Sequence, residues 1–344
     1  MQKFFAKAAA SALAAGAAGY SVPASSSLKA PFAIISALCG LLLYARVWIQ
    51  GYWFDRRYWR KVDLSGRVAL VTGGTVGGLG FAAASILAQM SAIVIVTVRS
   101  KAKGEAAVAA LGEGASYILC DFTSTASIKA AAAELSSMGV RRLDLLVLNA
   151  GISGDKNAPG NVWMANQVGP FLFTERLRPL LEATADEYGD VRVVAVSSGA
   201  HKRAFINYDD PWVAGGGVMT LGASPYGQSK LAQIMHMREL QRRVGLGGRF
   251  RCFAITPGFA LTNIMKPPKP LLPLAWLLAR SAHVGAMPIK MACVESELPG
   301  GSYISNCYVK ASEGKDGASN EPGEWEKLWA LCEKSVEEAA VRYP

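Results

Sequence analysis

The sequence predicts an α/β domain in which helices cover both faces of a doubly wound parallel sheet. Short, almost wholly apolar runs rich in Val, Ile and Leu alternate with longer alanine-rich stretches of the kind that form helices. Strands that are apolar throughout are buried on both faces, which favours a parallel sheet in a three-layer arrangement. No repeat or linker divides residues 62–344, so one domain is expected there. Strands are expected at residues 67–72, 91–98, 116–120, 143–149, 191–198 and 249–256.

Composition and charge argue against several classes of function. The formal net charge is +10, but most of the excess lies in residues 1–61, and the rest of the chain has no basic run or nucleic-acid-binding motif. The cysteines and histidines are scattered, and none stands at metal-ligand spacing. We therefore expect no nucleic-acid partner, no metal site, and free thiols in a reducing compartment.

Residues 1–61 are expected to be a targeting and membrane-anchor segment. Residues 31–49 form an apolar run whose one charge is Arg46, just long enough to cross a bilayer as a helix. Aromatic and basic side chains follow over residues 50–61, as on the cytosolic flank of a membrane helix. A buried core helix is the alternative. The basic, alanine-rich residues 1–20 suit an endoplasmic reticulum address, with the rest of the chain facing the cytosol, or a mitochondrial one.

The loop TGGTVGGLG, residues 72–80, is expected to hold the phosphates of a dinucleotide. It stands between a predicted strand and a predicted helix, so its backbone N–H groups and the positive end of the helix meet at one place. Its glycines fit two registers: one, with Gly73 and Gly77, leaves Leu79 at the third glycine position, and the other has an extra residue in the turn but ends in GGLG. We favour the second, because close approach to a pyrophosphate requires glycine beside the helix. The expected contacts are Gly73, Thr75, Gly78, Leu79 and Gly80.

Basic residues follow the second predicted strand, in VTVRSKAKGE. Arg99 and Lys103 stand where the ribose of a nucleotide would lie. An arginine there accommodates a 2′-phosphate, whereas an acid would accept a hydrogen bond from a free 2′-hydroxyl. This favours NADP(H) over NAD(H), and the alternative is an ordinary solvated loop.

Tyr226 and Lys230 stand four residues apart in YGQSK, within a predicted helix, and so lie on one helix face. An ammonium beside a phenol favours the phenolate, which would lower the pKa of Tyr226 and let it act as an acid or base near neutral pH. Taken alone, such a pair is more often two solvent-exposed side chains without a catalytic role. Its significance comes from the motifs around it.

Together these motifs resemble those of the short-chain dehydrogenase/reductase family, over nearly all of residues 62–344. The matching stretches, in order, are DLSGRVALVTGG, CDFTS, LVLNAG, ANQVGPFLFT, RVVAVSS, YGQSK and PGFALT. The resemblance implies a single Rossmann-type domain that catalyses an NAD(P)-dependent oxidation or reduction.

The resemblance also implies catalytic residues. Tyr226 would be the acid/base, Lys230 would hold the nicotinamide ribose and lower the pKa of the tyrosine, and Ser198 would hydrogen-bond the substrate oxygen. Asn166, in ANQVG, matches the asparagine that completes a proton relay through a bound water. Ser197 is the alternative to Ser198. Hydride transfer to a carbonyl leaves an alkoxide, which needs a hydrogen-bond donor and an acid, and a serine and a tyrosine supply both.

Further cofactor contacts follow from the same resemblance. Asp121 matches an acid that contacts adenine, Asn149 lies beside the adenine ribose, and Thr262 matches a residue that fixes the carboxamide. As an alternative, Asn149 and Gly151 serve only to stabilise the central strand. Neighbouring positions complete the expected set: Phe122, Ala150, Gly151, Pro257 and Gly258.

The nearest likeness within the family is to the retinol dehydrogenase-like, membrane-associated branch, carried by RSKAKGEAA, SSGAH, YGQSKLAQ, PGFALTNI and GSYISNC. Substrates of that branch are lipophilic alcohols and ketones such as retinoids; a sterol or another lipid stays open, as does a homodimer, and reduction is the favoured direction. The apolar residues 270–279 form either the mouth of a substrate site or ordinary core, and residues 201–225 either a lid or a surface loop. The alternative function is a non-catalytic nucleotide- or partner-binding membrane protein on the same fold.

Overall fold

The computed structural model describes residues 26–49, 61–154, 160–212, 224–245, 247–260, 279–312 and 315–344, together with residues 270, 275 and 277. In the first of these ranges, side chains are described for residues 34–46. Thr262, residues 213–223 and most of residues 261–278 lie outside the described residues, so what the sequence predicts for them stays a prediction.

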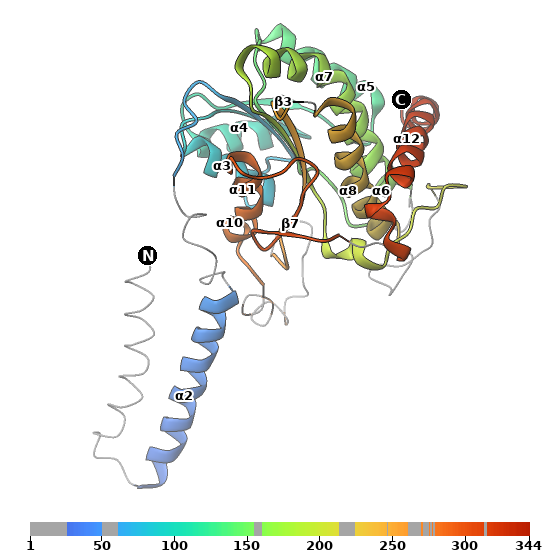
Figure 1. Ribbon diagram of the computed structural model, residues 1–344. Helices are drawn as coiled ribbons and strands as arrows, with labels where there is room; N and C mark the ends of the chain where they lie inside the picture. Colours follow the sequence, from blue (N-terminus) through green and yellow to red (C-terminus); the bar gives the residue numbers. More distant parts are fainter. Residues whose placement is uncertain are drawn as a thin grey trace.

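An eight-stranded sheet forms the centre of the described structure, in the order β3-β2-β1-β4-β5-β6-β7-β8 (Figure 1). Neighbouring strands are parallel except β7 and β8, which pair antiparallel at one edge. The strands are β1 Val68–Thr72, β2 Ile93–Val98, β3 Ser116–Leu119, β4 Leu145–Leu148, β5 Val191–Val196, β6 Phe250–Thr256, β7 Tyr303–Ser305 and β8 Tyr308–Lys310. Every predicted strand is present, so the doubly wound parallel sheet is confirmed; the short β7 and β8 are additions that the sequence patterns do not predict.

Helices cover both faces of the sheet and give the predicted three layers (Figure 1). α3, α4, α10 and α11 lie on one face, and α5, α7, α8 and α12 lie on the other. The described helices are α2 Ser26–Ile49, α3 Leu79–Ala88, α4 Lys101–Leu111, α5 Thr125–Ser137, α6 Gly160–Trp163, η3 Met164–Val168, α7 Gly169–Tyr188, η4 Gly199–Arg203, α8 Pro225–Val244, α10 Ala282–Gly285, α11 Met287–Val294, η6 Lys315–Asn320 and α12 Pro322–Arg342.

The core consists of two hydrophobic clusters, one on each face of the sheet. Successive side chains of a strand point to opposite faces, so each central strand contributes to both clusters. In β1, Leu70 packs in the cluster under α5, α7 and α8, while Ala69 and Val71 pack in the cluster under α3 and α11. This double burial explains why the strands are apolar without alternation.

The sequence around residue 224 specifies the start of α8. Ser224 is the N-cap, and its Oγ accepts a hydrogen bond from N of Gly227 at 2.9 Å. Pro225 takes the first helical position, where a missing N–H group costs nothing. The first turns of α8, which carry Tyr226 and Lys230, are therefore held in a defined position.

Asn166 lies in a π-helical turn between α6 and α7. This turn, η3, covers residues 164–168 and ends at Gly169, whose backbone N–H donates to O of Met164, five residues earlier. Such single turns occur often at functional sites, because they rotate one residue out of the regular helical register. Here the turn faces α8.

The sequence predicts a membrane-spanning helix over residues 31–49, and α2 includes this range. A bilayer span needs about 20 consecutive apolar residues. Among the described helices, none is both long and apolar enough for such a span. The predicted membrane-anchor helix is thus not found.

Candidate active site

The glycine loop has a conformation that requires glycine at several positions. Gly73 and Gly77 have φ values of 75° and 80°, in the left-handed region. Gly78 is the N-cap residue of α3. A Cβ at Gly80 would lie 2.4 Å from Nδ2 of Asn149 and 2.6 Å from O of Gly73, so glycine is required where α3 passes the sheet. The left-handed conformation of Gly77 belongs to the first register and the close packing at Gly80 to the second, so which amides contact a phosphate stays a prediction.

Asn149 joins the ends of two central strands. Its backbone N and that of Ala150 each donate to Oγ1 of Thr72 at 2.9 Å, and its side-chain Nδ2 donates to O of Thr72 at 2.8 Å. These bonds tie β4 to β1 beside the glycine loop, at the carboxyl edge where the strand order reverses. The strand-stabilising reading of Asn149 fits these contacts. Sequence reasoning missed Thr72, although its place just before the first glycine is a signal for it.

Arg99 and Asp121 follow β2 and β3 at the same edge of the sheet. Arg99 is exposed, and so is Lys103 in the first turn of α4. Oδ1 of Asp121 accepts from N and Oγ1 of Thr123 at 2.9 and 2.7 Å, which fixes this carboxylate within its own turn. Phe122 is buried in the core. The structure thus brings the predicted adenine-side residues to the edge that carries the glycine loop.

Ser198 and Tyr226 meet between the end of β5 and the first turn of α8. The Ser198 hydroxyl lies close enough to Tyr226 to affect the pKa of the phenol, and Oγ of Ser198 accepts from N of Ala200 at 3.3 Å. Ser197 is buried instead, and its Oγ donates to the backbone O of Lys230 at 2.7 Å. Of the two serines, Ser198 is therefore the one beside Tyr226.

Burial governs the ionisation of Tyr226 and Lys230. Burial raises the pKa of Tyr226, and the Ser198 hydroxyl offsets part of this rise. Burial also lowers the pKa of Lys230 to about 7. Nζ of Lys230 lies 5.3 Å from the centre of the Tyr226 ring. The predicted lowering of the Tyr226 pKa is wrong in direction, because the cost of removing a phenolate from water is the largest cause of the shift and Lys230 is not among its causes.

Both polar atoms of the Asn166 side chain have hydrogen-bond partners. Its Oδ1 accepts from N of Ile152 at 2.8 Å, and its Nδ2 donates to O of Ile152 at 2.9 Å and to Oγ of Ser229 at 3.0 Å. A Cβ at Gly151 would lie 2.8 Å from Oδ1 of Asn166. Asn166 thus fixes the loop after β4 against α8, and this close passage explains why glycine stands at position 151.

Lys230 is held by two acceptors. Its Nζ donates to O of Val196 at 2.9 Å and to Oε1 of Gln233 at 3.1 Å. Nε2 of Gln233 in turn donates to the backbone O of Asn166 at 2.6 Å. The side chains of Asn166, Lys230 and Gln233 are all buried. Sequence reasoning missed Gln233, although its spacing of three residues from Lys230 places it on the same helix face.

An arginine fastens the loop after β6. Gly258, which follows Pro257, has a φ of 75°. NH1 of Arg280 lies 3.5 Å from O of Pro257 and donates to Oδ1 of Asn306 at 2.6 Å. The backbone N of Arg280 donates to O of Phe259 at 2.8 Å. Arg280 is another residue that sequence reasoning missed, because its partners lie in segments far apart in the chain.

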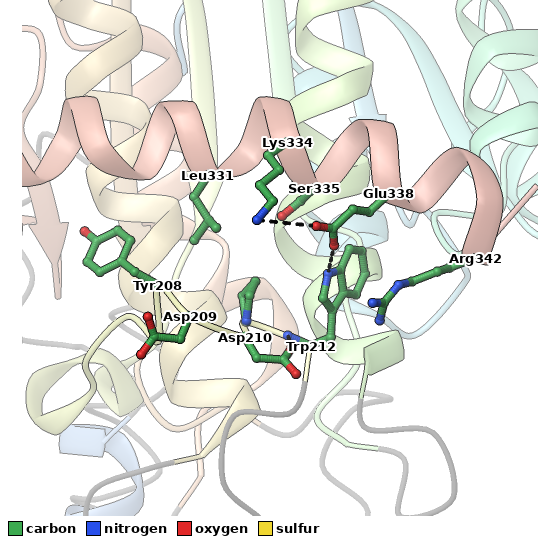
Figure 2. A pocket seen from close by; sticks show the side chains of 10 residues that line it. Tyr208, Asp209, Asp210, Trp212, Leu331, Lys334, Ser335, Glu338 and Arg342 are labelled. Carbon is green, nitrogen blue, oxygen red and sulfur yellow. Dashed lines mark hydrogen bonds and ion pairs between the residues drawn. The ribbon is translucent and has the colours of Figure 1, made fainter.

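A cavity of about 160 Å³ opens between residues 208–212 and α12 (Figure 2). Nε1 of Trp212 donates to Oε2 of Glu338 at 2.7 Å, and Nζ of Lys334 pairs with Oε1 of Glu338 at 3.8 Å. None of the predicted site residues lines this cavity. Its contacts fasten the described start of residues 201–225 to α12. The lining residues are Tyr208, Asp209, Asp210, Pro211, Trp212, Leu331, Lys334, Ser335, Glu338 and Arg342.

Among the described residues, the side chains that could bind a metal ion form no metal site, and the cysteines form no disulfide bond. No group of three or more His, Cys, Asp and Glu side chains there could hold a metal ion. The described cysteines are free; Cys39 is exposed and the others are buried. Burial raises the pKa of the thiols of Cys120, Cys252, Cys293, Cys307 and Cys332. Such thiols stay protonated and pack as small apolar groups.

The chain is similar in sequence to known dehydrogenases. The family model for short chain dehydrogenases matches residues 67–209. Dehydrogenase/reductase SDR family member 13 of Bos taurus is 38% identical, over 72% of this chain and 68% of the relative. Human polyprenol dehydrogenase is 30% identical, over 70% of this chain and 77% of the relative. Human retinol dehydrogenase 13 is 29% identical, over 80% of this chain and 87% of the relative. The chain therefore belongs to the short-chain dehydrogenase/reductase family of oxidoreductases, in its retinol dehydrogenase-like branch.

Proposed function

We propose that this protein interconverts a lipophilic alcohol and its carbonyl compound with NADP(H), and that Tyr226 is the acid/base. The observation that carries the proposal is the meeting of Ser198, Tyr226 and Lys230 at the carboxyl edge of the sheet, the edge that also carries the glycine loop. A bound nicotinamide cofactor would supply or accept the hydride. The side chains of the protein would supply the hydrogen bonds and the proton.

Ser198 and Tyr226 have different roles at the substrate oxygen in this mechanism. Oγ of Ser198 donates to that oxygen as negative charge develops on it, and the Tyr226 hydroxyl delivers the proton. Because burial raises its pKa, Tyr226 keeps its proton at neutral pH and is ready to act as an acid.

The residues around the glycine loop fit a dinucleotide. Glycine is required at Gly73, Gly77 and Gly80 by backbone conformation or close packing. α3 begins at Leu79, so Gly80 lies in its first turn. Backbone N–H groups at such a helix start favour a pyrophosphate. Arg99, exposed at the end of β2, suits a 2′-phosphate and supports NADP(H) over NAD(H).

The proposed substrate class follows the names of two relatives. One is a polyprenol dehydrogenase and the other a retinol dehydrogenase, and polyprenol and retinol are both lipophilic alcohols. We propose a substrate of this class, an isoprenoid or retinoid alcohol or the corresponding aldehyde or ketone. Long apolar chains of this kind partition into lipid, so the enzyme would meet them at a lipid surface.

We also place the protein at the endoplasmic reticulum, with its sheet domain in the cytosol. α2 supports only the membrane contact in this proposal, because it stands apart from the sheet (Figure 1) and exposes several large apolar side chains. Exposed apolar residues on one helix favour contact with a lipid surface. Flotation of the full chain with liposomes tests it, and failure to float would contradict it. These side chains are Ile34, Ile35, Leu38, Leu41, Leu42, Leu43 and Tyr44.

The decisive experiment measures NADPH oxidation by the purified full chain against retinal, a polyprenal and a steroid ketone. Tyr226→Phe should lower kcat by about 10²–10⁴-fold, as expected for loss of a general acid, while NADPH binding by fluorescence stays unchanged. Wild-type turnover by this variant would exclude Tyr226 as the acid/base. NADPH binding without reduction of any member of the panel would favour the non-catalytic alternative.

A further inference from the structure

The side chain of Gln233 joins two residues of the proposed active site. Its Oε1 accepts from Nζ of Lys230 at 3.1 Å, and its Nε2 donates to the backbone O of Asn166 at 2.6 Å. Its exposed fraction is 2%, and that of Lys230 is 3%. A buried amide with both ends in use is fixed in position, because breaking either bond would leave a polar group without water.

The two partners settle the orientation of the Gln233 amide. The carbonyl oxygen of Asn166 can only accept a hydrogen bond, so the NH₂ group of Gln233 must face it, and Oε1 then faces Lys230. Lys230 donates through Nζ in either protonation state. The bridge therefore runs in one direction, from the ammonium through the amide to the backbone of η3.

The sequence of the helix makes the Asn166 carbonyl available for this bridge. In a regular helix this oxygen would accept from the N–H group four residues later, but Pro170 stands there and has none. The π-turn shifts the pattern further, since Gly169 donates to Met164 rather than to Ala165. Pro170 cannot supply the usual donor, and the amide of Gln233 donates to this oxygen.

We propose that Gln233 is a positioning residue for Lys230, and that its amide bridges Lys230 to Asn166 where the family resemblance implies a bound water. The proposal rests on the proposed function, because Lys230 matters only as the residue beside the nicotinamide ribose. Unlike a water, an amide does not pass a proton from its oxygen side to its nitrogen side at low cost. The bridge therefore orients Nζ of Lys230 and closes the proton path toward Asn166.

The surroundings of Lys230 make this bridge sensitive to substitution. β5 presents the carbonyl of Val196, the loop after β4 passes at Gly151, and η3 presents Asn166. Tyr226, on the same helix, is the titratable side chain that the structure sets against Lys230. Burial is the cause of the lowered Lys230 pKa, and no neighbouring charge contributes to it among the described residues. Adding or removing polarity at position 233 should therefore move this pKa visibly.

The test is an NMR titration of Lys230 in the full chain labelled with [ε-¹³C]lysine, without cofactor or substrate. The Lys230 resonance is assigned by its loss in Lys230→Arg. Gln233→Glu should raise the Lys230 pKa by at least about one pH unit, because a carboxylate would face the ammonium. Gln233→Leu should lower it by about one pH unit, because the charged form loses an acceptor.

Gln241→Leu is the matched control. Gln241 lies on the same helix and also uses both ends of its amide, but toward two backbone groups: it accepts from N of Cys252 at 2.7 Å and donates to O of Phe250 at 3.3 Å. It does not contact Lys230, so its removal should leave the Lys230 pKa unchanged even where it lowers thermal stability. A role of Gln233 in packing alone would make both leucine variants behave alike.

Two outcomes would overturn the proposal. The first is an unchanged Lys230 pKa in folded Gln233→Leu, and the second is no rise in Gln233→Glu, which decides the matter if the leucine variant does not fold. The acid limb of the kcat/KM profile should follow the Lys230 pKa in the same variants. Because the titration uses no substrate, its failure is distinct from a failure of the proposed function, which the Tyr226→Phe assay reports.

Discussion

Oγ of Ser197 donates to the backbone O of Lys230 at 2.7 Å, so the serine next to the proposed substrate-binding serine secures α8 to the end of β5. The two adjacent hydroxyls thus have different partners, although the sequence shows only a pair of serines. Ser198 is beside Tyr226, and Ser197 is buried beneath it.

This difference predicts opposite effects for two matched substitutions. Ser198→Ala should lower kcat by about 10²–10³-fold, as for loss of one donor to a developing oxyanion, with little change in unfolding free energy. Ser197→Ala should cost about 1 kcal/mol in stability and leave kcat largely intact. Urea unfolding and steady-state assays on both variants check this. Equal kinetic effects would mean that the partners of the two serines do not separate their roles.

Arg99 predicts the cofactor preference. Arg99→Ala should raise the KM for NADPH by about ten-fold or more, through loss of a charge-assisted contact to the 2′-phosphate, and leave the KM for NADH unchanged. Arg141→Ala, an exposed arginine in the loop before β4, serves as the control and should affect neither. If wild-type enzyme used NADH as well as NADPH, the argument from Arg99 would fail.

Gly80 predicts the result of adding a single methyl group. Gly80→Ala places a Cβ 2.4 Å from Nδ2 of Asn149, so the packing of α3 on the sheet must shift, at a cost of about 1–3 kcal/mol. NADPH affinity should fall with it, because α3 starts at the loop. Gly323→Ala, in the first turn of α12, meets nothing within 4 Å and should be neutral or slightly stabilising. Thermal melts with and without NADPH separate the two effects.

His236 predicts how stability depends on pH. Its ring packs between Phe171 and Trp329 at centroid distances of 5.2 and 5.7 Å, and burial lowers its pKa from 6.5 to about 3. Between these two pKa values, His236 is therefore protonated in the unfolded chain and neutral in the folded chain. This contribution to stability is fully present above pH 6.5 and is lost as the pH falls toward 3.

His236→Phe removes that titration. Relative to the variant, the wild-type protein should lose up to about 1.4 kcal/mol per pH unit below pH 6. Chemical unfolding of both proteins at the same set of pH values between about pH 4 and about pH 8 measures the difference in their unfolding free energies. Parallel stability profiles would show that His236 titrates normally in the folded protein.

The central strands could be predicted because double burial leaves a clear pattern. β1, β4 and β5 are apolar at nearly every position, since each contributes to both core clusters. β7 and β8 could not, because strands of three residues carry too little pattern to be told from a loop. The helix that carries Tyr226 and Lys230 could also be predicted, since Ser224 and Pro225 mark its start.

The candidate site could be predicted in part, and its misses share one cause. Tyr226, Lys230 and Ser198 are found together, but Thr72, Gln233 and Arg280 act on backbone groups supplied by distant segments, which no local pattern reveals. The direction of the Tyr226 pKa shift could not be predicted for the same reason. The spacing of Tyr226 and Lys230 can be read from the sequence. The burial that raises the pKa of Tyr226 depends on the assembled fold.

The division of the core into two clusters has a consequence for how new specificities can arise. α3, at the proposed phosphate loop, packs in one cluster, and α8, which carries Tyr226, packs in the other, with the sheet between them. Substitutions that retune the nucleotide side and those that reshape the chemistry side therefore have few shared neighbours, and their energetic effects should add. We therefore expect substitutions that change cofactor choice and substitutions that change substrate choice to act independently of each other.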